Sequence, residues 1–460
     1  MTSERRRERS ALLTAVFTGV LAPLNSTMIV VALPDMLADL DAPLLWGSWI
    51  IVSYLVAMAA VLPLGGSLGD RYGRRRMLLL ALMGFTLASL LAALSWRIEV
   101  LVLARTLQAI TVASAIPNGV ALIRALLPEE RHGRAFGLLG AGIGVAAALG
   151  PPLGGLISDV LGWRWLFGAN LLVLVPGLLL AAGLPRGARA RESGRFDSLG
   201  AALLLVTLVG AALSATVWRI PAVPAFVPPT LVAVTLAAGS AFVRHARTAA
   251  APVLQLALLR RPGFLAAGMT VATSNLVMYT VFVALPLLLV QLARWDTRDV
   301  GWAIGGMSLA MLVCGPLGGA LSDRLGRRLP ALVGTLVALL GTLPFVFVSP
   351  AWPWGAFLAA LVVLGVGIGL ASAPVQAAAM RAAHPGEEGQ AAGLFATMRY
   401  AGSIVGTIGL AAVLGDAAEA PDYRLAFTLV VGVALLAVVS AWRLPRDARR
   451  EPRGDTGVSR

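Results

Sequence analysis

Continuous apolar runs of about twenty residues or more recur along this chain, and they restrict its fold more than any other feature. A run of that length can cross the roughly 30 Å of a bilayer's hydrocarbon as a helix, whereas the strands of a membrane barrel alternate in units of about ten residues. The chain is 58% hydrophobic and only 13% charged, far less charged than a soluble protein of this size. The sequence therefore predicts an all-α integral membrane protein.

Fourteen membrane spans are predicted from these runs, each boundary being set to within a few residues. They lie at about 11–33, 46–67, 77–95, 99–121, 135–157, 164–184, 199–218, 222–243, 263–290, 299–320, 329–348, 354–378, 390–414 and 424–443. We expect a six-helix bundle in residues 1–184, cytoplasmic linkers with two inserted helices in 185–262, and a second six-helix bundle in 263–443. The polar tail at 444–460 is expected to be disordered.

The basic residues indicate how the chain is oriented. All 37 are arginine, and with the N-terminus inside, 29 fall at cytoplasmic positions, six fall outside and two lie within spans. This bias follows the positive-inside rule and predicts a multi-pass protein of the cell membrane with both termini in the cytoplasm. We also expect the arginines at the inner surface to contact membrane lipids. The arginines that give the net charge of +14 thus determine the topology of the chain. No soluble domain is predicted that could carry a nucleic-acid role.

A long internal repeat divides the chain into two related halves. Residues 65–75 match residues 318–328, which lie 253 positions later. When the alignment is extended back to Trp49 and Trp302, 14 of 27 aligned positions are identical. Membrane proteins built from two parallel halves rock them about a central site. The repeat therefore predicts a transporter.

Four motifs in order resemble those of the major facilitator superfamily. Residues 66–76 resemble its signature loop, residues 101–108 its buried-arginine motif and residues 150–155 its antiporter motif. The plan of six, two and six spans resembles the fourteen-span drug:proton antiporter branch, as do Thr27 with Ala32-Leu33-Pro34, and Trp163 to Phe167 with Asn170. The resemblance covers nearly the whole chain. It implies two helical bundles, alternating access and export of amphipathic compounds.

The repeated loops are the predicted cytoplasmic gates. The Asp70 carboxylate follows a helix end, where it can pair with Arg71 or Arg74 or with a helix N-terminus of the other half; alternatively, the arginines only fix topology. The gate residues are Gly66, Asp70, Arg71, Gly73 and Arg74 in the first loop and Asp323, Arg324 and Arg327 in the second.

The fifth span is rich in small residues. Small residues allow helix backbones to approach closely in lipid, and proline permits bending. The span is expected to be either a static packing surface or a flexing interface between the halves. The motif residues are Gly150, Pro151, Gly154 and Gly155.

Two arginines lie within spans. Arg105 is placed roughly 9 Å below the outer boundary, and a charge in hydrocarbon costs at least about 2.5–3.5 kcal/mol. It is therefore expected to face a polar interior beside Gln108, or else to extend its side chain to the outer surface. Arg399 lies about 12–15 Å from the cytoplasmic side, either in a cavity or bonded structurally to carbonyl or tyrosine oxygens.

No acidic residue lies in the middle of a span, although the related branch usually has an aspartate in the first span, where this chain has Asn25. Arginine cannot act as a proton carrier because it does not deprotonate in proteins. If transport is driven by protons, the candidate carriers are the boundary acids Asp35, Glu99 and Asp70, or the substrate itself.

The predicted substrate cavity combines polar residues from several spans. Two fixed cations without a carboxylate favour neutral or anionic amphiphiles over dications. The candidates are Asn25, Ser26, Thr27, Tyr54, Arg105, Gln108, Asn118, Asn275, Tyr279, Gln376, Arg399 and Tyr400.

Taken together, these features predict secondary active export of amphipathic small molecules by a monomer, driven by protons. We expect no enzymatic activity, because no large domain outside the membrane is predicted, and no cofactor. A single cysteine excludes a cysteine cluster for a metal, and the lack of a phosphate-binding loop excludes an ATP-driven pump. Two other functions stay open. One is uniport or exchange of an endogenous anionic or lipid-like metabolite, and the other is a non-transporting membrane sensor.

Overall fold

All regular secondary structure in the described residues is helical. The computed structural model describes residues 3–184, 197–219, 223–249, 252–384, 387–414 and 418–446. Within these ranges, fourteen helical segments are long and apolar enough to cross a membrane, as the sequence predicted. Most of the predicted linker at 185–198 and nearly all of the tail lie outside the described residues.

The N-terminal half contains six of these spans. The helices are α1 (Ser3–Val31), α2 (Leu33–Asp39), α3 (Leu44–Tyr72), α4 (Arg74–Ala93), α5 (Ile98–Leu126), α6 (Glu129–Leu161), α7 (Trp165–Ala169) and α8 (Leu171–Ala182). The short α2 was not predicted, and the sixth span is divided between α7 and α8. Buried threonine hydroxyls within the spans, such as those of Thr14 and Thr18, donate to the carbonyl one turn earlier, which satisfies them without water.

Two inserted spans and six more follow. The inserted helices are α9 (Ser198–Thr216), which continues into η1 (Val217–Arg219), and α10 (Val227–Thr248). After η2 (Leu256–Arg260), the C-terminal half contains α11 (Pro262–Leu287), η3 (Leu288–Leu292), α12 (Thr297–Leu325), α13 (Arg328–Thr342), η4 (Leu343–Phe347), α14 (Trp354–Arg381), α15 (Glu388–Val413) and α16 (Ala420–Trp442).

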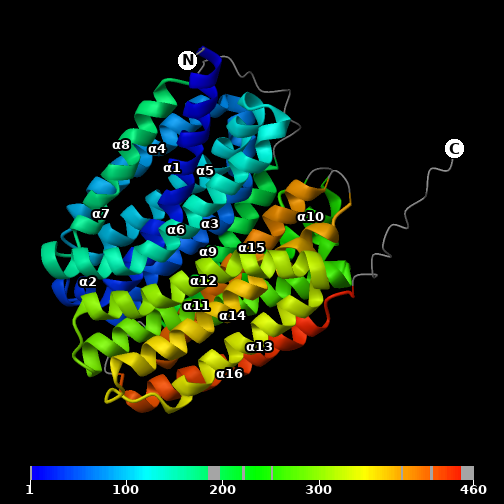
Figure 1. The fold of residues 1–460 in the computed structure, drawn as a ribbon. Helices are drawn as coiled ribbons and strands as arrows, with labels where there is room; N and C mark the ends of the chain where they lie inside the picture. Colours follow the sequence, from blue (N-terminus) through cyan, green and yellow to red (C-terminus); the bar gives the residue numbers. More distant parts are fainter. Residues whose placement is uncertain are drawn as a thin grey trace.

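The two halves pack side by side (Figure 1), with the blue and cyan helices of the N-terminal half on one side and the yellow to red helices on the other. The most extensive contacts across the boundary are made by two pairs of long helices: α6 packs against α12, and α3 packs against α15. The inserted helix α9 contacts both α3 and α15, while α10 packs on α9. The architecture is therefore two six-helix bundles plus two inserted helices.

Among the described residues, the buried apolar core that both halves share lies at one end. One cluster contains Ile29 and Leu33 from the N-terminal half together with Leu285 and Ile304 from the C-terminal half. At the opposite end, each half has a cluster of its own, around Phe85 in one and around Phe264 in the other. The molecule is thus closed at the end where α1 finishes and α3 begins, which we call the shared-core end.

The internal repeat is preserved in the backbone. Gly73 ends α3 with φ +94°, and its counterpart Gly326 ends α12 with φ +79°. These values lie in the left-handed region that glycine adopts without steric cost. Each glycine therefore permits a sharp turn between two long helices at the end opposite the shared-core end.

Candidate functional site

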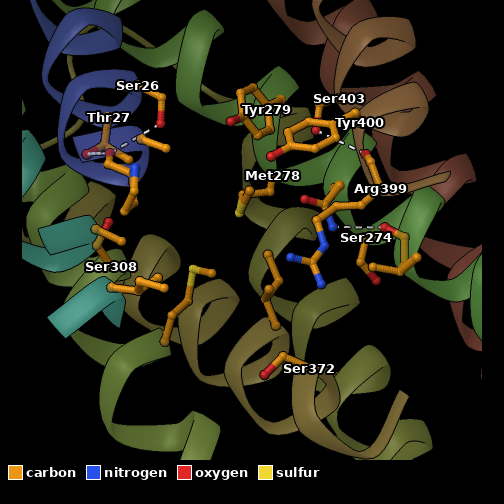
Figure 2. A pocket seen from close by; sticks show the side chains of 18 of the residues that line it. Ser26, Thr27, Ser274, Met278, Tyr279, Ser308, Ser372, Arg399, Tyr400 and Ser403 are labelled. Atoms are coloured by element: carbon orange, nitrogen blue, oxygen red, sulfur yellow. Dashed lines mark hydrogen bonds between the residues drawn. The ribbon is translucent and has the colours of Figure 1, made fainter. Parts of the chain in front are cut away.

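A cavity of about 510 Å³ lies between the two halves. Helices α1, α3, α5 and α6 line it from one side, and α11, α12, α14 and α15 from the other. In Figure 2, Ser26 and Thr27 lie on one side of the open space, and Tyr279, Tyr400 and Arg399 lie on the other. Apolar walls with a few polar groups suit an amphipathic small molecule.

Eight of the twelve predicted cavity residues line this space. They are Ser26, Thr27, Tyr54, Asn275, Tyr279, Gln376, Arg399 and Tyr400. The lining also includes residues that the sequence did not single out, since neither serine nor methionine is distinctive in an apolar helix. Among these are Met58, Ser274, Met278, Ser308, Met311, Ser372 and Ser403.

The other four predicted residues lie outside the cavity lining. Arg105 is only 1% exposed. Its Nη1 donates to Oδ1 of Asn25 and to Oε1 of Gln108 at 2.9 Å, and Gln108 in turn donates to the Ser89 hydroxyl at 2.8 Å. The guanidinium also lies 4.2 Å from the centre of the Tyr54 ring, which separates it from the cavity. Arg105 therefore anchors a buried polar cluster that joins α1, α3, α4 and α5.

Asn118 is a packing residue in this structure. Its Nδ2 donates to the Gly65 carbonyl at 2.8 Å and to the Ser114 carbonyl at 2.7 Å. The side chain is 1% exposed. It joins α5 to α3 just before the first gate loop.

Arg399 differs from Arg105 because it faces the cavity. Figure 2 shows its guanidinium extending from α15 into the space beside Met278. The guanidinium also lies 5.6 Å from the centre of the Phe395 ring. Among the described residues that line the cavity, Arg399 alone is charged.

The first gate loop is held together within its own half. Asp70 accepts hydrogen bonds from Nη2 of Arg74 at 2.9 Å and from its Nε at 3.1 Å. Nη1 of Arg74 also donates to the Ala121 carbonyl at 3.2 Å, so the pair joins α3, α4 and α5. Arg71 stacks on Tyr72 at 5.4 Å.

In the second gate loop, Asp323 and Arg324 are exposed and Arg327 is partly buried. Gly66 is partly buried near Pro117 in the first loop. The eight predicted gate residues thus flank two turns of the same shape, one in each half.

The glycines of α6 lie at contacts with two different helices. A Cβ at Gly154 would lie 2.6 Å from the Met28 carbonyl oxygen of α1. A Cβ at Gly155 would lie 2.6 Å from the Thr297 carbonyl oxygen, and one at Gly301 would lie 2.6 Å from the Pro151 carbonyl oxygen. Gly150 similarly packs against Thr27. Helix α6 therefore contacts α1 through one face and α12, across the boundary, through another.

The three candidate proton carriers have different surroundings. Asp35 accepts a hydrogen bond from the Ser158 hydroxyl at 2.5 Å and another from the Thr297 hydroxyl at 3.0 Å, so it joins α2 and α6 to α12. Glu99 pairs at 3.2 Å with Arg97, two residues away. Asp70 pairs within the N-terminal half. No group of three His, Cys, Asp or Glu side chains suited to a metal ion occurs among the described residues.

Two side-chain pairs, each with a carboxylate, lie at the end opposite the shared-core end and were not predicted, because their partners lie far apart in sequence. Glu387, before α15, accepts hydrogen bonds from Arg261 at 2.7 Å and from Gln255 at 3.1 Å. The Arg261 guanidinium chiefly holds the pKa of Glu387 at about 2. The pair ties the segment before α11 to the loop before α15.

The second pair joins the two inserted helices. Asp197 lies 2.6 Å from Nε2 of His245 and accepts backbone hydrogen bonds from Gly200 and Val253. Burial opposes ionisation of the carboxyl, but these hydrogen bonds outweigh it and lower the pKa of Asp197. The contact between Asp197 and His245 therefore joins α9 to α10 at this end.

Two repeated six-helix bundles around a central amphipathic cavity are the architecture of a class of membrane transporters. Comparison with known proteins names the family. The model of the Major Facilitator Superfamily matches residues 15–407, and this chain belongs to that superfamily.

Relatives and a solved structure agree with this assignment. "Multidrug resistance protein Stp" of Mycobacterium tuberculosis is 31% identical over 88% of this chain and 76% of its own. "Puromycin resistance protein pur8" of Streptomyces alboniger is 30% identical over 95% of this chain and 91% of its own. A crystal structure of a D-xylose-proton symporter superposes with a TM-score of 0.71 at 14% identity, covering 96% of this chain and 98% of that one. This last likeness concerns the fold alone.

Proposed function

We propose that this transporter exports amphipathic small molecules from the cytoplasm by alternating access. The observation that carries the proposal is the cavity between the halves, which combines aromatic, methionine and hydroxyl side chains. Such a lining accepts varied apolar bodies while offering a few polar contacts. The drug-resistance names of the two relatives support the same substrate class.

The orientation of the structure in the membrane is inferred from the arginine distribution. If arginine-rich segments lie in the cytoplasm, the shared-core end faces outside and the two gate loops face the cytoplasm. The structure then corresponds to a state closed to the outside. Substrate would enter from the cytoplasm and leave when the shared-core end opens.

Proton coupling is assigned to Asp35 as part of this proposal. Its carboxylate contacts both halves, whereas Glu99 and Asp70 pair locally. Protonation would remove a charged acceptor from the contact with Ser158 and Thr297, and so favour opening of the shared-core end. For net exchange, a proton taken up at Asp35 in the outward-open state would be released to the cytoplasm when the contact with Ser158 and Thr297 re-forms.

We take Asp35 to be the acid that titrates at this contact, because the other charged groups near it are bound elsewhere or exposed. On α2, Asp39 is bound to Arg164 at 2.6 Å. Helices α1, α3 and α11, which contact α2, carry no charged residue at this end. The charged residues beside its two hydrogen-bond partners are all exposed: Asp159, Asp296, Arg298 and Asp299.

Transport by purified protein in proteoliposomes tests the proposal. With an imposed pH gradient, we expect uphill movement of a fluorescent amphiphilic dye that a protonophore abolishes. Asp35→Asn should abolish uphill movement and retain exchange of labelled for unlabelled dye, which needs no net proton transfer. Uphill transport by Asp35→Asn would contradict the role of Asp35, and absence of any dye movement by the wild type would contradict export.

Uniport or exchange of an endogenous anion is the second candidate function. It is favoured by Asn25, which bonds to Arg105 and cannot titrate, and by the cation of Arg399 in the cavity. In that case the same assay would show movement only down the substrate gradient, and a protonophore would have no effect.

A further inference from the structure

The cavity holds an uncompensated positive charge. Arg399 is partly buried on α15 and extends into the space between the halves (Figure 2). No ion pair between its guanidinium and a carboxylate is recorded within the described ranges, and no aspartate or glutamate lines the cavity. A guanidinium away from bulk water is strongly stabilised by an anion that accepts its paired N–H donors.

Arg105 lies behind Tyr54 and does not compete for the same ligand. Its guanidinium is enclosed by Asn25, Gln108 and the Tyr54 ring. The other side of Tyr54 lines the cavity, and its hydroxyl has no hydrogen-bond partner among the described residues although the residue is 3% exposed. A phenol backed by a cation and lacking a partner is an available donor for an acceptor in the cavity.

The rest of the lining fits a flat apolar body. Tyr279, Tyr400 and Phe282 supply aromatic surface, and Met58 and Met278 supply adaptable thioether contacts. Aromatic rings stack on such residues with a gain beyond burial of area. Both the charge and the aromatic lining therefore point to one kind of ligand.

We propose that the cavity selects amphiphiles with an aromatic body and an anionic end, such as a carboxylate, sulfonate or phenolate. Arg399 binds the anionic group, the Tyr54 hydroxyl donates to the same end of the ligand, and Tyr279 and Tyr400 pack against the ring system. This assignment rests on the proposed transport function and narrows its substrate class.

Two xanthene dyes of opposite charge test the selection. Fluorescein is anionic and rhodamine 6G is cationic, while their ring systems are alike. Binding would be measured by fluorescence polarisation to the full-length protein in lipid nanodiscs. We expect fluorescein to bind at least about tenfold more tightly, and Arg399→Gln to weaken its binding by about 10- to 100-fold, the effect of losing one charge-assisted contact.

Three further variants keep the result interpretable. Arg399→Lys keeps the charge and should lose less affinity than Arg399→Gln, and Tyr54→Phe removes only the hydroxyl and should weaken fluorescein binding by several-fold. Exposed Arg134→Gln makes the same charge change outside the cavity and should have no effect. Size-exclusion chromatography checks that each variant is folded.

The opposite pattern would overturn the assignment. Tighter binding of rhodamine 6G by the wild type, or unchanged fluorescein binding by folded Arg399→Gln and Tyr54→Phe, would exclude an anion site at Arg399. Binding does not depend on transport direction or driving force. Anion selection without export would therefore contradict the proposed function alone, whereas export without charge preference would contradict this assignment alone.

Discussion

At the scale of single residues, the two arginines within the bundle have different tasks because their partners differ. Arg105 donates to two side-chain oxygens and stacks on Tyr54, so its charge is stabilised by the fold. Arg399 faces the cavity, so a ligand can supply its counter-charge. Substitution of Arg105 and substitution of Arg399 should therefore change different kinetic quantities of transport.

Arg105→Ala is expected to lower the maximal transport rate by at least about tenfold and to lower the melting temperature. Removing the guanidinium leaves the oxygens of Asn25 and Gln108 unpaired in the interior, at about 1–3 kcal/mol for each group. The substrate concentration for half-maximal rate should change little, since Arg105 does not line the cavity. Rates across a substrate series, with thermal unfolding in detergent, test this. A rise in that concentration at unchanged maximal rate would show that Arg105 binds substrate directly.

Glu387→Gln should change how stability depends on pH. The folded-state pKa of Glu387 is about 2, below the ordinary 4.5, so ionised Glu387 stabilises the fold fully above about pH 4.5. That stabilisation is lost as the pH falls towards 2. The difference in melting temperature between wild type and Glu387→Gln should therefore be largest above pH 4.5 and shrink on acidification. Exposed Glu130→Gln serves as the control, and a constant difference at all pH values would contradict the Arg261 contact.

At the scale of helices, the boundary between the halves depends on close approach of α6 and α12. Gly155 and Gly301 allow the two backbones to touch near Thr297. In lipid, such contact is stabilised by dispersion forces rather than by exclusion of water. The same contact must separate if the shared-core end opens, so its strength influences the balance between states.

Gly155→Ala is expected to weaken this contact. A Cβ there would meet backbone atoms of α12 at 2.6 Å, and overpacking of this kind costs about 1–3 kcal/mol. Gly140→Ala, on the same helix with nothing within 4 Å, is the matched control and should be neutral or slightly stabilising. Thermal unfolding and dye transport measure the two effects. Equal behaviour of the two variants would mean that α6 and α12 are not in backbone contact.

At the scale of the whole molecule, the halves share an apolar core at one end and have separate cores at the other. A transporter that alternates access must exchange these two arrangements. Asp35 and its two hydroxyl partners lie at the shared-core end, across the boundary. A covalent link there should hold the molecule in the present state.

Cross-linking Ser158→Cys to Thr297→Cys, in a Cys314→Ser background, is expected to stop transport. Both hydroxyls bond to the same Asp35 carboxylate, so a short thiol cross-linker can join the two positions. Transport should return on reduction. Glu8→Cys with Arg131→Cys, whose side chains meet at 2.5 Å within one half, is the control and should transport when cross-linked. Continued transport by the cross-linked Ser158–Thr297 pair would exclude opening at this end.

The sequence predicted the fourteen spans and the repeat because each depends on local properties, namely run length, apolarity and matching residues. It also indicated eight lining residues of the cavity, since polar side chains are conspicuous in apolar helices. It could not separate Arg105 from Arg399, because exposure to a cavity depends on Tyr54, a residue of another helix. The Glu387–Arg261 pair was missed for the same reason, since its partners are 126 positions apart.

By itself, the sequence determined that this chain spans a membrane many times in two related halves, because the cost of placing backbone and charge in hydrocarbon acts on each segment separately. The tertiary structure decided which end is closed, which arginine faces the cavity and which carboxylate joins the halves. These features depend on contacts between helices that are distant in sequence, and such contacts exist only once the two bundles have packed together.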